Sequence, residues 1–414
     1  MRLDRLTALG WRNLHGPDPS RTADSPSPAV AETPEPSRQG PLQPLEWAPH
    51  PRFNLVVGDN GQGKTNLLEA IAVLAGLRSF RTARLQDGIS FGQTTAVLTA
   101  KVFSRGLPSH LGLELTQRGR RTLVDGKTTT SAAQFLGRLT AVVFTPADLA
   151  LPHAEPEARR RWLDRVVFNH QPAHLDELRR YEQALTARNA VLRAHAAGKI
   201  SADAALLDVY DQLIARHGAE VIRRRQHVLD QFVPVVQQVF GQIAAPGLTC
   251  DIRYLPKVAS QTEAELLHIL QERRPRDLGA GHTTRGPHRD DVALLIADRP
   301  AAGHASQGQS RALVLAGKIA EIASLEKTLG EAPLLLLDDV SSELDARRNA
   351  ALMAHLDELG GQVVLTTTAA EHIRVAAPRQ IFHVRSGQLT DGSVLGDSGA
   401  HARGSQSSMD LSLR

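Results

Sequence analysis

Apolar side chains recur with two different periods along the chain. Residues 53–57, 94–145, 333–337 and 362–368 carry short apolar runs or alternate apolar with polar positions, which is typical of β-strands. From residue 156 to about residue 240, apolar positions recur every three or four residues, which predicts helices. The change of period predicts an α/β protein in which a mainly helical second lobe is inserted into a lobe with a mixed β-sheet.

Composition sets the boundaries that we expect. Lobe I should comprise residues 1–145 and 330–390, and lobe II residues 146–329. Residues 17–44 are rich in Pro, Ser, Ala and Glu and offer few apolar side chains to bury, which predicts a flexible insertion. Residues 391–414 are rich in Gly and Ser, which predicts a flexible tail.

One stretch near the start carries a phosphate-binding pattern. Gly58, Gly63, Lys64 and Thr65 fit the spacing G-x-x-x-x-G-K-[ST], between a predicted strand and an amphipathic run. Glycines let the backbone curl so that its N–H groups face phosphate oxygens, and the following helix adds its positive dipole end. We expect Lys64 to reach the β- and γ-phosphates and the Thr65 hydroxyl to ligate Mg²⁺. The expected nucleotide contacts are Gly58, Asp59, Asn60, Gly61, Gln62, Gly63, Lys64, Thr65 and Asn66.

Two acids follow the strand predicted at residues 333–337. A carboxylate at the end of a buried strand beside a phosphate loop is where Mg²⁺ needs an anchor, so we expect Asp338 to support the metal. Asp339 is then placed to polarise the attacking water as a general base. The plainer alternative is a strand that ends in a polar loop.

A second anion-binding sequence precedes a helix predicted at residues 312–325. Ser306, Gly308 and Gln309 are small or polar residues at a helix start, where N–H groups suit a γ-phosphate. Because the phosphate loop already holds one nucleotide, this element is expected to contact ATP bound by another copy across a two-fold interface. It therefore predicts a homodimer that forms on ATP.

Charge adds a candidate partner. The 414 residues include 48 Lys and Arg against 44 Asp and Glu, a formal net charge of only +4, but arginines come in short clusters. Such clusters suit the phosphate backbone of single- or double-stranded DNA. The candidate DNA contacts are Arg120, Arg121, Arg223, Arg224 and Arg225. A solvated helix face with acids nearby is the alternative for any single cluster.

The single cysteine, Cys250, excludes an internal disulfide and offers no cysteine metal cluster. The sequence contains no run of about 18 apolar residues, so it predicts no membrane-spanning helix. Both features favour a cytoplasmic protein.

The order of these motifs resembles the ABC-type ATPase heads of SMC-like proteins, and within them the RecF family of bacterial DNA replication and repair proteins. The matching pieces are residues 11–13, 58–70, 78–81, 188–192, 286–291, 306–309 and 337–340. Gly-Pro-His-Arg-Asp-Asp at 286–291 and Arg-Asn-Ala at 188–190 are specific to that family.

The resemblance implies an ATP-dependent DNA-binding dimer. It would act at single-strand gaps, in the DNA-damage (SOS) response, with RecO and RecR to help load the RecA recombinase. Lys64 and Thr65 would hold ATP and Mg²⁺, Asp338 would support the metal, and Ser306 with Gly308 would contact the partner's ATP. Asp345 would sit in a loop facing the partner.

We expect a weak, DNA-stimulated ATPase that acts as a switch. Departures from the wider ABC pattern predict that its hydrolysis is slow and acts as a timer. Transporters place Glu where this chain has Asp339, one methylene shorter, and a histidine where Thr366, Thr367 and Thr368 follow Leu365. RecF shares both features.

Two other functions stay open: a transporter-type ATPase subunit, and a scaffold in which nucleotide is structural and never hydrolysed. For His288 we expect a structural or DNA-side role, because no nucleophile or metal spacing accompanies it. Arg289 is expected to pair with Asp290 or Asp291.

Overall fold

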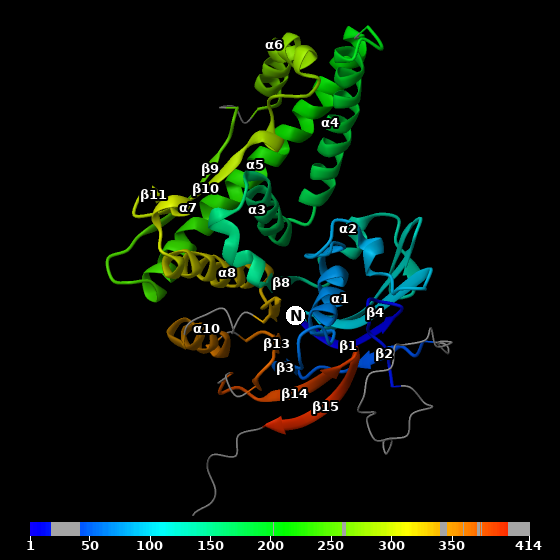
Figure 1. Cartoon of the computed structure of the whole chain (residues 1–414), viewed down its shortest axis with the longest axis vertical. Helices are drawn as coiled ribbons and strands as arrows, with labels where there is room; N and C mark the ends of the chain where they lie inside the picture. Colours follow the sequence, from blue (N-terminus) through cyan, green and yellow to red (C-terminus); the bar gives the residue numbers. More distant parts are fainter. Residues whose placement is uncertain are drawn as a thin grey trace, which may run out of the picture.

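The computed structural model describes residues 1–17, 42–201, 203–258, 262–339, 346–358, 360–370, 373 and 375–395. Strands around helix α1 (Lys64–Gly76) build the lower lobe in Figure 1, together with α2 (Ala132–Phe135) and α10 (Ala346–Glu358), and long helices build the upper one. We call them lobe I and lobe II. Among the described residues the strands form two six-stranded sheets and one three-stranded sheet, so the predicted α/β class is confirmed.

The first sheet of lobe I is mainly parallel and joins segments from both halves of the chain. In order across the sheet its strands are β15 (Gln388–Leu395), β14 (Arg379–Arg385), β3 (Phe53–Val57), β13 (Val363–Thr367), β12 (Leu334–Asp338) and β8 (Ala141–Phe144). Only the β14–β15 pair is antiparallel among these described strands. β12 and β13 are buried along their whole length, which explains their near-continuous apolar sequences.

The second sheet of lobe I is antiparallel. Its order is β2 (Leu45–Trp47), β1 (Arg2–Leu9), β4 (Thr95–Ser104), β5 (Leu107–Thr116), β6 (Gly119–Val124) and β7 (Lys127–Thr128). Asp125 and Gly126 form the two-residue β6–β7 turn, and both have positive φ, the conformation that an Asp-Gly pair favours in hairpins. Helix α1 (Lys64–Gly76) shares one hydrophobic core with strands of both sheets, so it is buried on nearly all sides.

Lobe II is mainly helical, as predicted. Its elements are η2 (Pro146–His153), α3 (Pro156–His170), α4 (His174–Ala196), α5 (Ala204–Ile243), β9 (Cys250–Leu255), α6 (Glu263–Ala280), η3 (Pro287–Arg289), β10 (Asp291–Ile296), β11 (Arg299–Pro300), α7 (Ala301–His304) and α8 (Gln307–Leu329). α10 (Ala346–Glu358) follows β12. The sequence pattern did not predict α6, because only Leu266 and Leu270 are buried apolar residues on it.

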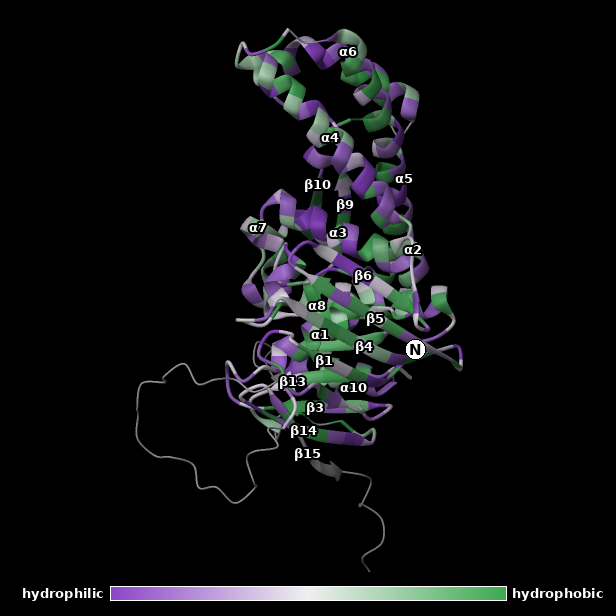
Figure 2. Cartoon of the chain, turned by 90° about the vertical axis from the view of Figure 1, so that its right-hand side faces the viewer, coloured by the Kyte–Doolittle hydropathy of each residue, from purple (hydrophilic) through white to green (hydrophobic). Residues whose placement is uncertain are grey.

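Hydropathy differs between the lobes. Figure 2 shows hydrophobic residues gathered along the strands of lobe I, whereas polar and apolar residues alternate over the arm of α4, α5 and α6. The alternation reflects helices that each bury one face. None of the described helices is long and apolar enough to cross a membrane.

The predicted tail begins too early. Residues 391–395 belong to β15, in which Asp391, Val394 and Leu395 pair with β14 on either side of one irregularity. Residues 396–414 of that tail, residues 18–41 of the predicted insertion, and Asp345 lie outside the described residues.

Candidate functional site

The phosphate loop connects β3 to α1 with the glycines where the backbone requires them. Gly61 and Gly63 have φ of +80° and +117°, which L side chains rarely adopt. A Cβ on Gly58 would stand 2.3 Å from the carbonyl oxygen of Val384 on β14. The loop is therefore shaped by its own glycines and by a close neighbouring strand.

Lys64 lies over this loop with its charged end turned inward. Its Nζ donates hydrogen bonds to the carbonyl oxygens of Gly58, at 2.5 Å, and Asp59, at 3.0 Å. The residue is only 6% exposed. A buried ammonium group thus sits where the loop curls, and its predicted contact with the β- and γ-phosphates stays a prediction.

The predicted acid lies directly beside the first turn of α1. Oδ1 of Asp338 accepts hydrogen bonds from the hydroxyl groups of Thr65 and Thr366, both at 2.9 Å. Parallel pairing places the carboxyl ends of β3, β13 and β12 at one edge of the sheet, which is why three residues so distant in sequence meet. The structure therefore brings Thr65 and Asp338 together, and it adds Thr366, which the sequence marked only as a departure.

Asp339 continues from Asp338 in an unusual backbone conformation. Its φ is +49°, and its N–H donates to the carbonyl oxygen and the hydroxyl of Thr366, at 3.2 and 3.0 Å. Asp is among the few residues besides Gly that tolerate this region. The neighbouring strand thus fixes the position from which this second carboxylate projects.

Two of the matched motifs converge on one buried carboxylate of α1. Glu69 is 0% exposed and accepts a two-pronged pair from Arg12, at 2.9 and 2.7 Å, and a hydrogen bond from the Ser79 hydroxyl. Arg81 lies 3.5 Å from the same carboxylate and donates to the Asn66 side chain. The Asn66 amide, predicted as a nucleotide contact, also donates to Asn13, at 2.6 Å. Residues 11–13 and 78–81 thus hold α1 in place through hydrogen bonds to its side chains.

The turn between β14 and β15 supports the phosphate loop from another side. The N–H groups of Ser386 and Gly387 donate to the Gln62 side chain and carbonyl oxygen, at 2.6 and 2.8 Å. A Cβ on Gly387 would stand 1.8 Å from the carbonyl oxygen of Asn13, so only glycine fits. Sequence reasoning missed this contact, although the isolated Ser-Gly between two alternating runs was a usable hairpin signal.

The second predicted anion site begins α8 with a capping box. The Ser306 hydroxyl accepts from the N–H of Gln309 at 3.2 Å, and the Gln309 side chain accepts from the N–H of Ser306 at 2.8 Å. This box does not involve the N–H groups of Gln307 and Gly308. The guanidinium of Arg348, on α10, lies 3.0 Å from where a Cβ on Gly308 would stand. Within the described part of the chain, no hydrogen bond joins Ser306 or Gln309 to the phosphate loop.

His288 has a hydrogen-bond partner within lobe II at each ring nitrogen. Its Nε2 lies 3.1 Å from the carbonyl oxygen of Thr283, so this nitrogen carries the proton, and Nδ1 accepts from the Tyr181 hydroxyl at 2.5 Å. Burial lowers the pKa of His288 to about 4, which keeps the ring neutral. A neutral imidazole held at both nitrogens joins α4 to the 286–291 motif.

The pairing predicted for Arg289 is replaced by other partners. Asp291 forms a two-pronged pair with Arg159 of α3, at 2.9 and 2.8 Å. Asp290 is 0% exposed and accepts from the Tyr254 hydroxyl and the N–H of Lys257. Both acids therefore tie the motif to other parts of lobe II, namely α3 and the end of β9.

The Arg-Asn-Ala element at 188–190 holds the arm together. Arg188 is 0% exposed and donates to Asp211 of α5 and Asp277 of α6, both at 2.7 Å, and to the Thr283 hydroxyl at 2.9 Å. The Asn189 side chain accepts from the N–H and hydroxyl of Thr283. Three helices and a loop meet at one guanidinium.

The DNA prediction is wrong for Arg225. Its side chain is buried and forms a two-pronged pair with Asp164, both contacts at 2.8 Å. Arg223 and Arg224 remain nearer the surface but both pair with Glu220. The run 223–225 is thus largely neutralised by acids.

The other pair of candidate arginines lies on β6. Arg121 is exposed and pairs with Glu114 on β5. Arg120 donates to the carbonyl oxygen of Leu77 at 2.8 Å, and burial together with the charges of Arg179 and Arg78 lowers its pKa to about 10. Arg120 thus lies close to two other positively charged side chains, those of Arg78 and Arg179.

The comparisons with known proteins decide the family. The model of the RecF/RecN/SMC N-terminal domain matches residues 42–390. The DNA replication and repair protein RecF of Myxococcus xanthus is 41% identical over 346 residues, covering 81% of this chain and 90% of the relative. The chain belongs to the RecF family. The resemblance inferred from the motifs is thereby confirmed.

Solved structures agree with the family. The recombination mediator protein RecF with ATPrS, from the RecFOR pathway, matches with a TM-score of 0.79 at 26% identity, covering 94% of this chain and 98% of that one. A Pyrococcus yayanosii Smc head domain with a coiled coil matches with a TM-score of 0.51 at 12% identity, covering 95% and 97%. The second likeness concerns the fold alone, and it agrees with the predicted ABC-type head.

Proposed function

We propose that this chain is an ATP-dependent DNA-binding switch of recombinational repair and replication. ATP held at residues 58–66 brings two copies together across residues 306–309, and the dimer binds DNA at single-strand gaps. With RecO and RecR it helps to load RecA, and slow hydrolysis returns the dimer to single copies. The observation that carries the proposal is the meeting of Lys64, Thr65 and Asp338 at one phosphate loop, in a chain whose relatives are RecF proteins.

The residues present fit ATP with Mg²⁺. The Lys64 ammonium now bonds two loop carbonyl oxygens, and phosphate oxygens are stronger acceptors for the same protons. Thr65 and Asp338 offer hard oxygen ligands in direct contact with one another. When bound, Mg²⁺ would neutralise charge on the β- and γ-phosphates.

Dimerisation follows from the second anion site. The helix start at Ser306 offers the N–H groups of Gln307 and Gly308, and Arg348 adds a positive charge beside them. Since no hydrogen bond among the described residues joins this site to its own chain's phosphate loop, a second copy is the natural source of the phosphate.

Hydrolysis is expected to be slow. Asp339 is the proposed general base, and its backbone is fixed through Thr366, but its carboxylate is one methylene shorter than that of a glutamate. It therefore reaches less far towards the attacking water. Turnover would act as a timer that releases DNA.

Sedimentation with and without ATP and a gapped DNA tests the proposal. Wild type should change from monomer to dimer on ATP with Mg²⁺, and the dimer should hold the DNA. Lys64→Met should do neither, whereas the matched control Lys101→Met, which removes a partly exposed lysine on β4, should behave as wild type. If mass and DNA affinity ignore ATP, the scaffold function replaces this one; an ATP-dependent dimer without DNA affinity favours the transporter-type alternative.

A further inference from the structure

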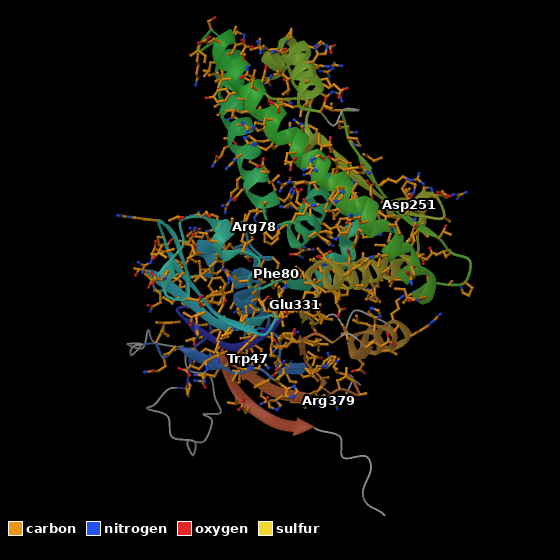
Figure 3. All side chains as sticks on the ribbon, turned by 180° about the vertical axis from the view of Figure 1, so that it is seen from behind. Trp47, Arg78, Phe80, Asp251, Glu331 and Arg379 are labelled. Atoms are coloured by element: carbon orange, nitrogen blue, oxygen red, sulfur yellow. The ribbon has the colours of Figure 1, made fainter. Side chains whose placement is uncertain are left out.

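A large cavity lies where lobe I meets lobe II. Its volume is about 1070 Å³, and its walls come from the segment after α1, from β6 and from helices α3 and α4. Figure 3 shows Arg78 and Phe80 at this level, between the sheets of lobe I and the helices of lobe II. We call this space the interlobe cleft.

The walls of the interlobe cleft carry an excess of positive charge. Seven arginines line it against three carboxylates. Two of those carboxylates already have cationic partners, because Asp148 pairs with Arg165 and Asp164 pairs with Arg225. The third, Glu182, lies near Arg78. Among the lining residues, positive charge therefore exceeds negative charge. Acids just outside the lining pair with three of the arginines, since Arg81 lies 3.5 Å from Glu69, Arg161 lies 3.5 Å from Glu157 and Arg179 lies 3.8 Å from Asp176.

Three of these arginines converge from three elements. Arg78 follows α1, Arg120 lies on β6, and Arg179 lies on α4. Burial lowers the pKa of Arg78 and of Arg120, and the charge of neighbouring arginines lowers both further, whereas Glu182 and Asp164 act in the opposite direction on Arg78. Like charges held together in a partly buried place cost stability, and an anion that binds there removes the cost. Guanidinium groups suit a phosphate in particular, because their N–H groups form a planar fork.

Aromatic rings stand beside the arginines. Phe80 and Phe168 line the cleft and are partly exposed. A ring can stack on the face of an unpaired base, whereas bases inside a duplex present only their edges. The combination of arginines and rings is the one that single-stranded nucleic acid uses for sequence-independent binding.

We propose that the interlobe cleft binds a single-stranded DNA segment, with backbone phosphates on Arg78, Arg120 and Arg179 and a base against Phe80. This inference rests on the proposed function, because it names the part of a gapped DNA that the cleft would hold. Duplex on either side of the gap would contact other surfaces.

Fluorescence anisotropy tests the proposal with the full chain, ATP and a labelled oligo(dT) of about 15 nucleotides, beside a duplex of equal length. Arg78→Gln and Arg120→Gln should each flatten the slope of log affinity against log salt for oligo(dT) by about 0.7, the loss of one phosphate contact. Phe80→Leu should weaken oligo(dT) binding by about fivefold or more through lost stacking. All three should leave duplex affinity and the ATP-dependent dimer unchanged.

Arg193→Gln is the matched control, since it removes an exposed arginine from α4, the helix of Arg179, about 21 Å away. It should leave the oligo(dT) slope as in wild type. If the cleft variants bind oligo(dT) with the wild-type slope, the inference is overturned while the proposed function stands.

Two further outcomes also overturn it. One is that Arg78→Gln reduces affinity for tripolyphosphate or labelled polyglutamate but not for oligo(dT), which would assign the cleft to a small anion or an acidic peptide. The other is that it weakens duplex and oligo(dT) equally. If wild type binds neither DNA in the presence of ATP, the proposed function fails first.

Discussion

Replacing Arg188 by Met should loosen the helical arm. Methionine keeps much of the length but removes three donated hydrogen bonds, to Asp211, Asp277 and Thr283. Asp211 keeps Arg274 as a partner, at 2.5 Å. Among the described residues, Asp277 keeps only neutral donors, from Thr284, so its buried charge loses its counter-ion.

The expected magnitude follows from burial. Both side chains of the Arg188–Asp277 pair are essentially inaccessible, at 0% and 1%. Removing one member of such a pair costs about 3–5 kcal/mol, because the other charge stays buried. A domain is stable by about 5–15 kcal/mol in total, so the arm of Arg188→Met should be close to unfolding.

Urea unfolding followed by circular dichroism, with limited proteolysis of the arm, measures the change. Arg161→Met is the control: its partner Glu157 is 3.5 Å away and both side chains are 71% exposed, so it should cost no more than about 0.5 kcal/mol. Adding Asp277→Asn to Arg188→Met should recover part of the loss, since no charge is then left unpaired. An unfolding midpoint for Arg188→Met equal to that of the control would refute the reasoning.

Further outcomes test the site and its surroundings. Asp339→Asn should keep ATP-dependent dimers and abolish phosphate release; unchanged release would remove Asp339 from the base role. Because the pKa of His288 is lowered from 6.5 to about 4, the unfolded chain takes up the proton first as the pH falls. Stability should therefore be lost between these values, by about 1.4 kcal/mol per pH unit, and His288→Gln should flatten that part of the pH profile. Gly387→Ala should weaken ATP binding by at least about tenfold in a filter or calorimetric assay, because its Cβ would strike Asn13 and push the hairpin from the phosphate loop. Unaltered affinity would show that this support is dispensable.

The sequence predicted the phosphate loop and Asp338 because each is a local pattern with a fixed spacing. A strand, a glycine turn and a helix start suffice to place Lys64 and Thr65. The carboxylate could be placed because parallel strands end at a common edge of the sheet. The structure shows Thr65 and Asp338 in contact, as that reasoning required.

The supports around the loop could not be predicted in the same way. Glu69 meets Arg12 across 57 positions, and Gln62 meets Ser386 across 324. Nothing in the neighbourhood of either residue in the sequence names its partner. Only the matched motifs at 11–13 and 78–81 hinted that these segments belong together.

The arginine run at 223–225 failed as a prediction for a geometric reason. Consecutive helical residues point about 100° apart, so three neighbours cannot share one face. Arg225 turns into the core, where Asp164 of α3 neutralises it, whereas Arg223 faces outward. Arginines that are neighbours in the sequence were therefore not neighbours in space. The arginines that do lie together, Arg78, Arg120 and Arg179, come from three separate segments.

The sheet order of lobe I bears on how the chain matures during synthesis. β3 carries the phosphate loop, yet its neighbours β13 and β14 begin only at Val363 and Arg379. The ribosome releases the whole of lobe II before either neighbour exists, so the arm is free to fold first. Until then the backbone N–H and C=O groups along both edges of β3 have no strand to pair with. A nascent or prematurely ended chain would lack the strands that shape the loop. We therefore expect nucleotide to bind only after nearly the whole chain has been synthesised.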